Sequence, residues 1–215
     1  MIKIEHTDVY GFESAIRGMR NPMNSWEMSD SEFNVKYHDC DTYVGQNDLK
    51  LMKNLSKAGN DHGKFLRMIN VTVDITAPLY WWKEFDTYKI GTVANSCSTM
   101  HKIHAKEFEM DDFSCDNLNF GGQVVLQYTI DHLNKCRDAF LECKDKEWWW
   151  QMIQLLPSSY NQKRTVQLNY QVLKTMYFAR RNHKLDEWHT LCEWMESLPY
   201  FEEICLSPHA CQATE

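Results

Sequence analysis

The alternation of apolar and polar residues predicts two β-strands in the first half of the chain. In Met1–Val9 the apolar residues Ile2 and Ile4 alternate with polar neighbours. The segment Ile69–Thr76 alternates strictly and is rich in β-branched side chains. We expect one face of this second strand to be buried against helices.

Apolar residues at helical spacing predict a series of helices, and the longer ones lie in the second half of the chain. The predicted helices span Tyr10–Arg20, Asp48–Ala58, Pro78–Phe85, Val124–Cys143, Trp148–Leu156, Thr165–Arg181 and Leu185–Ser197. Asn47 is the expected N-cap of the second helix, and Pro157 is expected to end the fifth. The segments Met23–Val44 and Gly91–Thr99 follow neither period, so we predict loops there.

This order of elements predicts one α+β domain that covers residues 1–215. The strands come early and the helices late, which is typical of a small antiparallel or mixed sheet covered by a helical layer. The sequence contains no repeat and no composition change that would indicate a linker.

Composition and charge disfavour several classes of function. The 215 residues include 23 Lys and Arg against 30 Asp and Glu, a net charge of -7 at pH 7, so generic nucleic-acid binding is not expected. No apolar run approaches the ~20 residues that span a membrane, and the first residues lack the layout of a signal peptide. We therefore expect a cytoplasmic protein whose eight cysteines are thiols.

One group of residues has the spacing of a metal site. Cys97, His101 and His104 would share one face of a helix at i, i+4 and i+7. However, no further ligand at a fixed spacing stands nearby, and the chain has no C-x-x-C pair. Surface or half-buried packing is the simpler interpretation, so we predict no metal site.

Two other clusters have alternative interpretations. The side chains of Trp148–Trp150 point in three directions on a helix, which favours an oligomer interface first and stacking on a ligand base second. Gln162–Arg164 precedes the predicted helix at 165–181, where its cations and the helix N-terminus would hold an anion. An ordinary solvated loop explains the second cluster equally well.

Two segments, taken in chain order, resemble the flavin-dependent thymidylate synthase family. MINVTVDITAPLYWWKEFDTYKIGTVANSCSTMHK is similar to the family segment that leads into an Arg-His-Arg-x-x-Ser-x-Asn-Glu-x-Ser-x-Arg signature. LLPSSYNQKRTVQLNYQVLKTMYFARRNHKLDEW resembles the family's downstream helix. The resemblance covers His62 to Trp188. It implies a homotetramer that binds FAD between subunits and reductively methylates dUMP with methylenetetrahydrofolate and NADPH.

The resemblance also assigns residues to the nucleotide. Ser98 matches the second Ser of the signature and would contact the nucleotide phosphate. Arg180 matches the catalytic Arg whose charge polarises the pyrimidine ring and helps to activate C5. Lys89 lies where the family has its Arg-His-Arg triplet and would supply a positive charge to the nucleotide.

A second set of residues is assigned to the cofactor by the same resemblance. Asn169 matches the helix Asn that meets the flavin, and Gln171 stands in place of an Arg on that helix. Asn95 matches the Asn of the signature, and His62 matches a His that precedes the strand. These four residues are the expected contacts to FAD.

The departures from the signature bear on the chemistry. Tyr88-Lys89-Ile90 stands in place of Arg-His-Arg, Ser96 in place of Glu, and Met100 in place of Arg. Each lost charge-assisted hydrogen bond is worth ~1.5–3 kcal/mol, and a lysine does not reproduce the fork of an arginine. Three functions therefore remain: a flavin-dependent methyltransferase or oxidoreductase with altered pyrimidine C5 chemistry, a non-catalytic nucleotide-binding or sequestering protein, or a structural interaction module.

Overall fold

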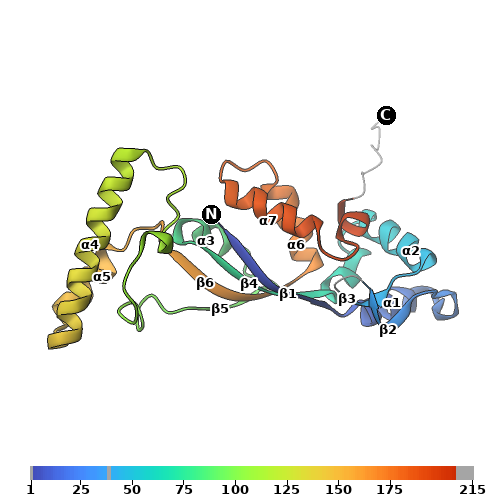
Figure 1. Cartoon of the computed structure of the whole chain (residues 1–215). Coiled ribbons are helices and arrows are strands. Elements are labelled where there is room, and N and C mark those ends of the chain that lie inside the picture. Colours follow the sequence, from blue (N-terminus) through green and yellow to red (C-terminus); the bar gives the residue numbers. More distant parts are fainter. Residues whose placement is uncertain (1, 38–39, 207–215) are drawn as a thin grey trace. The chain divides into compact units, whose positions relative to one another are not determined.

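The computed structural model describes residues 2–37 and 40–206. Its principal elements are β1 (Lys3–Tyr10), α1 (Phe12–Arg20), β2 (Glu32–Tyr37), β3 (Cys40–Tyr43), α2 (Gln46–Lys57), β4 (Asn70–Pro78), α3 (Leu79–Phe85), β5 (Val93–Ser96), α4 (Phe120–Cys143), α5 (Lys146–Leu155), β6 (Asn161–Asn169), α6 (Tyr170–Arg180) and α7 (Asp186–Glu196). Figure 1 shows these elements along the chain.

The chain divides into two compact units. Unit 1 contains the described residues of Met1–Lys3, Ile75–Thr87 and Asn95–Thr165, and unit 2 contains those of Ile4–Asp74, Tyr88–Ala94 and Val166–Glu215. A four-stranded sheet has the order β1-β4-β6-β5, and each of its strands has residues in both units. Along β4, buried and half-buried residues alternate as the sequence pattern predicts. The predicted α+β class with a small sheet is confirmed.

Unit 2 is built around aromatic side chains from distant segments. Tyr170, the first residue of α6, is fully buried and lies edge-on to Phe12 and Phe201, with ring centres 5.8 and 5.2 Å away. Its hydroxyl donates to the carbonyl oxygen of Pro199 at 2.6 Å. In Figure 1, α6 and α7 lie side by side, and the indole of Trp194 in α7 donates to Thr7 Oγ1 in β1. Tyr170 thus anchors the start of α6 in the core of unit 2, and Trp194 ties α7 to β1.

Unit 1 contains two apolar clusters. In the first, Trp81, Trp82 and Phe85 of α3 pack ring against ring at 4.9–5.2 Å, and the indole of Trp82 donates to the carbonyl oxygen of Gln162. In the second, α4 and α5 pack against the preceding loop through the buried residues Ile103, Phe108, Phe113, Leu126, Ile130, Leu133, Cys136 and Met152. Both predicted helices at 124–143 and 148–156 are confirmed, with earlier starts.

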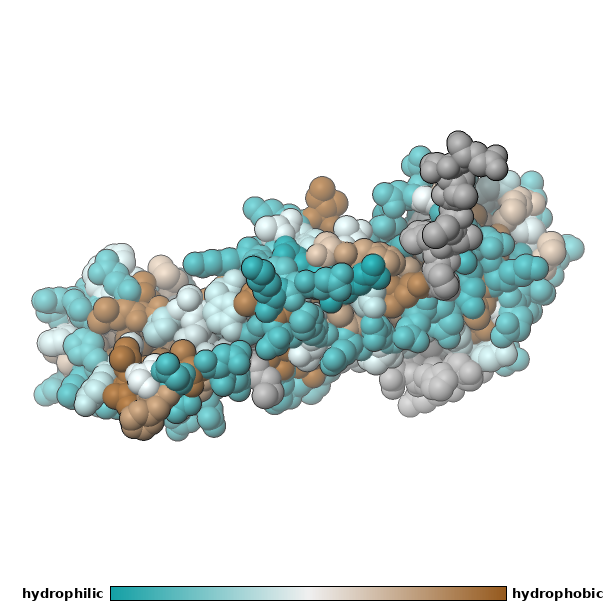
Figure 2. Space-filling model, turned by 90° about the horizontal axis from the view of Figure 1, so that it is seen from above, coloured by the Kyte–Doolittle hydropathy of each residue, from teal (hydrophilic) through white to brown (hydrophobic). Residues whose placement is uncertain are grey.

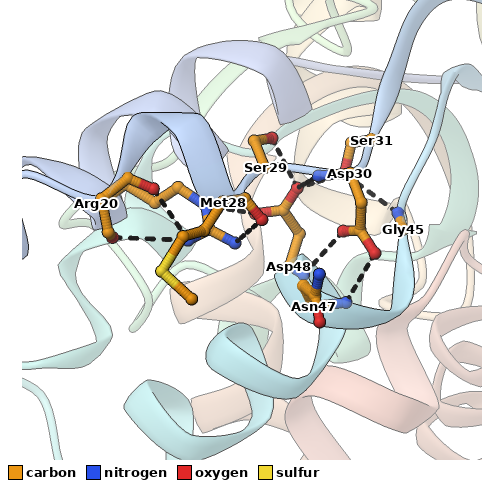
Figure 3. Close-up of polar contacts among 9 residues, drawn as sticks. Arg20, Met28, Ser29, Asp30, Ser31, Gly45, Asn47 and Asp48 are labelled. Atoms are coloured by element: carbon orange, nitrogen blue, oxygen red, sulfur yellow. Dashed lines mark hydrogen bonds and ion pairs between the residues drawn. The ribbon is translucent and has the colours of Figure 1, made fainter.

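The prediction of a loop at Met23–Val44 is wrong, because β2 and β3 pair antiparallel within it. A buried ion pair stabilises this segment (Figure 3): Arg20 Nε donates to Asp48 Oδ1 at 2.6 Å. The other carboxylate oxygen of Asp48 accepts hydrogen bonds from the hydroxyls of Ser29 and Ser31 at 2.7 and 2.6 Å. Residues 38 and 39 of the predicted loop lie outside the described residues.

Asn47 is not the N-cap of the second helix. Helix α2 begins at Gln46, and Gly45 occupies the cap position without a side-chain bond. Instead, the carboxylate of Asp30 accepts the backbone N–H groups of Asn47 and Asp48 at 2.9 and 3.1 Å (Figure 3). The orphan donors of the helix are thus satisfied by a residue 17 positions earlier, which no local pattern indicates.

Two further corrections concern the sheet. The predicted helix Thr165–Arg181 starts only at Tyr170, because residues up to Asn169 form β6 between β4 and β5. The predicted loop Gly91–Thr99 contains β5, whose four residues are all exposed and therefore show no apolar alternation. Sheet pairing overrides the local helical period at 165–169.

The predicted anion site at Gln162–Arg164 is also wrong, since these residues lie inside β6 and not at a helix N-terminus. Arg164 Nη1 pairs with Asp86 Oδ1 at 2.7 Å, and its guanidinium lies 4.1 Å from the ring centre of Trp82. Arg164 therefore joins β6 to the end of α3. Within the part of the chain that the structure describes, no helix is long and apolar enough to cross a membrane.

Candidate nucleotide and cofactor site

Arg180, the last residue of α6, is held by two aromatic side chains. Its Nε donates to the hydroxyl of Tyr88 at 2.9 Å. Its guanidinium lies 4.7 Å from the ring centre of Trp188 and 5.6 Å from that of Tyr88. Trp188 is fully buried, whereas Arg180 and Tyr88 are half-buried. The aromatic faces attract the cation and fix the plane of its fork, so Arg180 is oriented before any ligand arrives.

A tight turn after α6 places the ring of Trp188 against the guanidinium of Arg180. The backbone N–H of His183 donates to the carbonyl oxygen of Arg180 at 2.9 Å, and His183 Nδ1 accepts from Leu185 N at 3.2 Å. Helix α7 then begins at Asp186 and places Trp188 in its first turn. The imidazole of His183 lies edge-on to Trp188, with ring centres 6.2 Å apart. The turn thus encloses one side of the guanidinium site.

The segment Tyr88–Ala94 runs close to α6. Gly91 has φ +75°, and a Cβ there would lie 3.1 Å from Asn169 Nδ2 and 3.2 Å from Val172 Cγ2. A larger residue would be strained in this backbone conformation and crowded by α6. Gly91 therefore permits the close approach that also lets Tyr88 reach Arg180.

Asn169, the expected flavin contact, caps α6. Its Oδ1 accepts the backbone N–H of Val172 at 3.1 Å, and its side chain is 9% exposed. The acceptor half of the amide therefore has a structural role. The donor half, Nδ2, faces Gly91.

His62 and Gln171 lie in the same region of unit 2. Gln171 Nε2 donates to Asn60 Oδ1 at 3.4 Å, and Asn60 lies two residues before His62. His62 lines an open pocket of about 740 Å³, together with Gly18, Met19, Asn21, Pro22, Met23, Leu55, Asp61, Lys64, Phe65 and Met68. This volume is in the range of small-molecule sites. Most of the lining side chains are apolar, which suits a planar ring, and Asp61, His62 and Lys64 are its ionisable residues.

Of the three remaining expected contacts, Ser98 and Asn95 belong to unit 1 and Lys89 to unit 2. Ser98 is exposed, and its Oγ accepts the backbone N–H groups of Met100 and His101 at 3.3 and 2.9 Å. Both acceptor positions hold the turn, so the hydroxyl hydrogen can donate to a phosphate oxygen. Asn95 is exposed in β5. Lys89 is exposed in unit 2, next to Tyr88.

The three residues considered as metal ligands do not lie on one helical face. Residues 97–104 are not helical, so Cys97, His101 and His104 do not share a helical face. In the tryptophan run, the half-buried Trp149 donates to the carbonyl oxygen of Met100 at 2.9 Å. Trp148 and Trp150 remain 39% and 43% exposed.

Sequence reasoning missed the residues that hold Arg180 and the floor of the pocket. From the sequence, Tyr88 was identified only as a departure from the Arg-His-Arg triplet, and Trp188 only as the last residue of the region that resembles the family. Met19, Met23 and Met68, which line the pocket, were not predicted to be part of any site. One pattern in the sequence could have indicated the contact between Arg180 and Trp188. Trp188 follows Arg180 by eight positions, and a turn lies between them.

Comparisons with known proteins show which solved structures have a similar fold. No family model matches the chain, and no curated protein sequence matches it. Among solved structures, two of thymidylate synthase ThyX from Helicobacter pylori, both with FAD and dUMP, match with a TM-score of 0.66. The first is 18% identical and the match covers 95% of this chain and 96% of that chain. The second is 19% identical and the match covers 95% of this chain and 97% of that chain. The UMP/dUMP methylase PolB from Streptomyces cacaoi, bound with 5-Br dUMP, has a TM-score of 0.58 at 14% identity, covering 91% of this chain and 88% of its own.

The class that these findings define is the thymidylate synthase-like α+β fold. The chain adopts the fold of the flavin-dependent thymidylate synthase ThyX over nearly its whole length. The resemblance stated from the two sequence segments is therefore confirmed at the level of the fold.

Proposed function

We propose that this chain binds a pyrimidine nucleotide of the dUMP type and that Arg180 contacts its base. The observation that carries the proposal is the guanidinium held between Tyr88 and Trp188 at the end of α6. A half-buried, pre-oriented cation stabilises negative charge on a carbonyl oxygen of a pyrimidine ring and so polarises C5. The solved structures with this fold bind dUMP or 5-Br dUMP.

The phosphate of the nucleotide is assigned to Ser98 and Lys89. The hydroxyl of Ser98 keeps a hydrogen to donate, and the exposed ammonium of Lys89 supplies charge. Both assignments follow from position in the resembling segment.

FAD is the proposed cofactor, and the pocket beside His62 fits part of it. A volume of about 740 Å³ with Met and Phe side chains in its lining accepts one planar ring system, and His62 and Lys64, which line it beside Asp61, would contact a phosphate. Gln171, Asn169 and Asn95 supply amide groups for the remaining polar contacts. When bound, FAD would supply hydride transfer, while these residues bind and orient it.

We further propose a cytoplasmic homotetramer with these pockets between subunits and with altered C5 chemistry on the pyrimidine. Tyr88 supports the altered chemistry. Where the resemblance expects a cationic triplet, a neutral phenol accepts the hydrogen bond from Arg180 Nε.

The first test measures ligand binding with a matched pair of variants. Arg180→Ala removes the held guanidinium, whereas Arg181→Ala removes its exposed neighbour, which stacks on Phe178 at 5.2 Å. dUMP should raise the melting temperature of the wild type and of Arg181→Ala through linkage, and should not raise that of Arg180→Ala. Equal shifts in all three proteins would remove Arg180 from the site, and no shift in any of them would contradict nucleotide binding.

The second test concerns FAD. Purified protein is mixed with excess FAD, unbound FAD is removed, and the visible absorption spectrum is recorded. The proposal expects a retained flavin spectrum that His62→Ala weakens. A colourless wild-type protein would contradict FAD as the cofactor.

A second candidate function is non-catalytic binding or sequestering of the nucleotide, which the loss of the Arg-His-Arg triplet favours. Release of tritium from [5-³H]dUMP in the presence of FAD, NADPH and methylenetetrahydrofolate separates the two. Binding with tritium release supports chemistry at C5. Binding without release supports sequestering.

A further inference from the structure

Surface character alone does not select a ligand for this chain. On the face that Figure 2 shows, hydrophilic residues predominate and hydrophobic ones form separate groups. Selection between pyrimidine nucleotides of the same charge and size therefore depends on single hydrogen-bonding groups at the site. The hydroxyl of Tyr88, which accepts a hydrogen bond from Arg180, is such a group.

The hydroxyl of Tyr88 keeps its hydrogen available for a ligand. A phenol hydroxyl donates one hydrogen bond and also accepts, whereas an arginine side chain only donates. The phenol oxygen accepts from Arg180 Nε at 2.9 Å, so this contact leaves the hydroxyl hydrogen unused. Within residues 2–37 and 40–206, it is the one hydrogen bond that the side chain of Tyr88 makes. The structure therefore presents a donor whose acceptor has to come from outside the described residues.

The neighbouring cation makes this donor stronger and its ring is held in place. Hydrogen bonds in a chain polarise one another, so a hydroxyl that accepts from a guanidinium donates more strongly. The ring of Tyr88 lies edge-on to the buried ring of Trp188, with ring centres 6.2 Å apart. Both aromatic rings also lie close to the guanidinium of Arg180, at 5.6 and 4.7 Å. The position of the donor is thus fixed before a ligand binds.

The chemistry of Tyr88 suits a contact to a base better than a contact to a phosphate. Tyr88 stands first in Tyr88-Lys89-Ile90, where the resemblance expects Arg-His-Arg. A positively charged donor forms a strong, charge-assisted bond to a phosphate, and a neutral phenol does not. A neutral donor matches a neutral carbonyl oxygen, which is the kind of acceptor that a pyrimidine ring offers.

We propose that Tyr88 determines specificity for the base, because its hydroxyl donates to the O4 oxygen of a uracil ring. The inference rests on the proposed function, in which Arg180 contacts the base and polarises C5. Negative charge at C5 is delocalised through C4 onto O4, so O4 is the atom at which a donor assists C5 chemistry. A guanidinium that acts there brings the Tyr88 hydroxyl to the same edge of the base, since the phenol oxygen lies 2.9 Å from Nε.

This arrangement selects uracil over cytosine. Uracil carries an acceptor at C4, whereas cytosine carries an amino group, which is a donor. Because the oxygen of Tyr88 already accepts from Arg180, the pair presents donors to the ligand. A cytosine amino group would leave the Tyr88 hydrogen without an acceptor, and a loss of this kind weakens binding about tenfold or more.

The test compares the Kd values of dUMP and dCMP, measured by isothermal titration calorimetry, for the wild type and Tyr88→Phe. We expect the wild type to prefer dUMP about tenfold or more, and Tyr88→Phe to reduce that preference about fivefold or more. The matched control is Tyr10→Phe, since the hydroxyl of Tyr10 also accepts from a side chain, Gln167 Nε2 at 2.8 Å. This control should keep the wild-type preference. If Tyr88 only positioned Arg180, its loss would weaken both nucleotides equally, and an unchanged preference in Tyr88→Phe would overturn the proposal.

The atom that Tyr88 contacts has its own test, a double-mutant cycle between the protein and the ligand. Sulfur accepts hydrogen bonds more weakly than oxygen, so 4-thio-dUMP should bind the wild type more weakly than dUMP does. The two ligands should differ much less in Tyr88→Phe. The isomer 2-thio-dUMP should show the same change in both proteins. Coupling of Tyr88 to the 2-position, or to neither position, would overturn the contact to O4.

The same measurements separate this inference from the proposed function. A wild type that binds dUMP, with a preference over dCMP that Tyr88→Phe leaves unchanged, would overturn the role of Tyr88 alone. A wild type that binds neither nucleotide would contradict the proposed function, and the inference that rests on it would fall with it. Circular dichroism spectra should be the same for all the proteins, because each substitution removes a single hydroxyl group.

Discussion

Arg180 and Tyr88 are 92 positions apart in the chain, and the Nε of the arginine donates to the phenol oxygen of the tyrosine at 2.9 Å. Tyr88 lies on a segment that approaches α6 because Gly91 has no side chain. Trp188 supplies the second aromatic face, from the first turn of α7. The orientation of Arg180 therefore depends on the segment between α3 and β5, on the end of α6 and on the turn before α7, so changes at these places should alter what Arg180 binds.

Replacing Tyr88 with Phe tests this dependence. The variant keeps the ring beside Arg180 and removes only the hydroxyl that accepts from Nε. A hydrogen bond to a charged group contributes ~1.5–3 kcal/mol. We therefore expect the Kd for dUMP to rise about tenfold or more, with a melting temperature close to that of the wild type. Isothermal titration calorimetry measures the Kd, and Tyr10→Phe, at an exposed tyrosine, is the control.

Replacing Asp48 with Asn should change both stability and its pH dependence. Burial disfavours the charged carboxylate of Asp48, but the hydrogen bonds from Ser31, Ser29 and Arg20 outweigh this effect and hold its pKa below the usual 3.8. A lowered folded-state pKa stabilises the protein above pH ~4, and this stabilisation is lost as the pH falls through the folded-state pKa. Breaking a buried pair costs ~3–5 kcal/mol at pH 7.

Urea denaturation at several pH values measures this effect. The variant should be much less stable at neutral pH and should lose less stability than the wild type below pH ~4. Asp8→Asn, at an exposed aspartate of β1, should leave the curve unchanged. A variant as stable as the wild type at pH 7 would show that the network in Figure 3 contributes little.

The cysteines should divide into two groups by reactivity. Burial raises the pKa of the Cys205 thiol to about 12 and that of Cys192 to about 11, so neither forms the reactive thiolate near neutral pH. Cys97 and Cys143 are exposed. Mass spectrometry after brief iodoacetamide treatment should find Cys97 and Cys143 modified in the folded protein, and Cys192 and Cys205 modified only after unfolding. Early modification of Cys205 would contradict its burial.

The sequence predicted elements where the local period and the tertiary contacts agree, as in β4, α4 and α5. It failed where distant residues decide the structure. The segment from Thr165 to Asn169 has apolar residues that suit a helix, but pairing with β4 and β5 makes it a strand. The cap of α2 comes from Asp30 and not from the adjacent Asn47.

The candidate site shows the same limit. Arg180 and Asn169 could be named from the similar segments. Their environments could not, because the contacts to Tyr88 and Gly91 join parts of the chain that only the fold brings together. The pocket beside His62 is formed by α1 and by the turn after α2, and no single stretch of sequence contains it.

Two substitutions of Asn169 can separate its role as the cap of α6 from its proposed role as a contact to FAD. Its Oδ1 caps α6 through Val172 N, and its Nδ2 faces Gly91. Asn169→Asp keeps a capping oxygen and removes the amide donor, whereas Asn169→Ala removes both. Because loss of an N-cap costs ~1 kcal/mol, we expect thermal unfolding to show a destabilised Ala variant and an Asp variant close to the wild type. If the Nδ2 group binds FAD, both variants should lose flavin retention. An Asp variant that retains FAD as the wild type does would assign Asn169 to the helix cap alone.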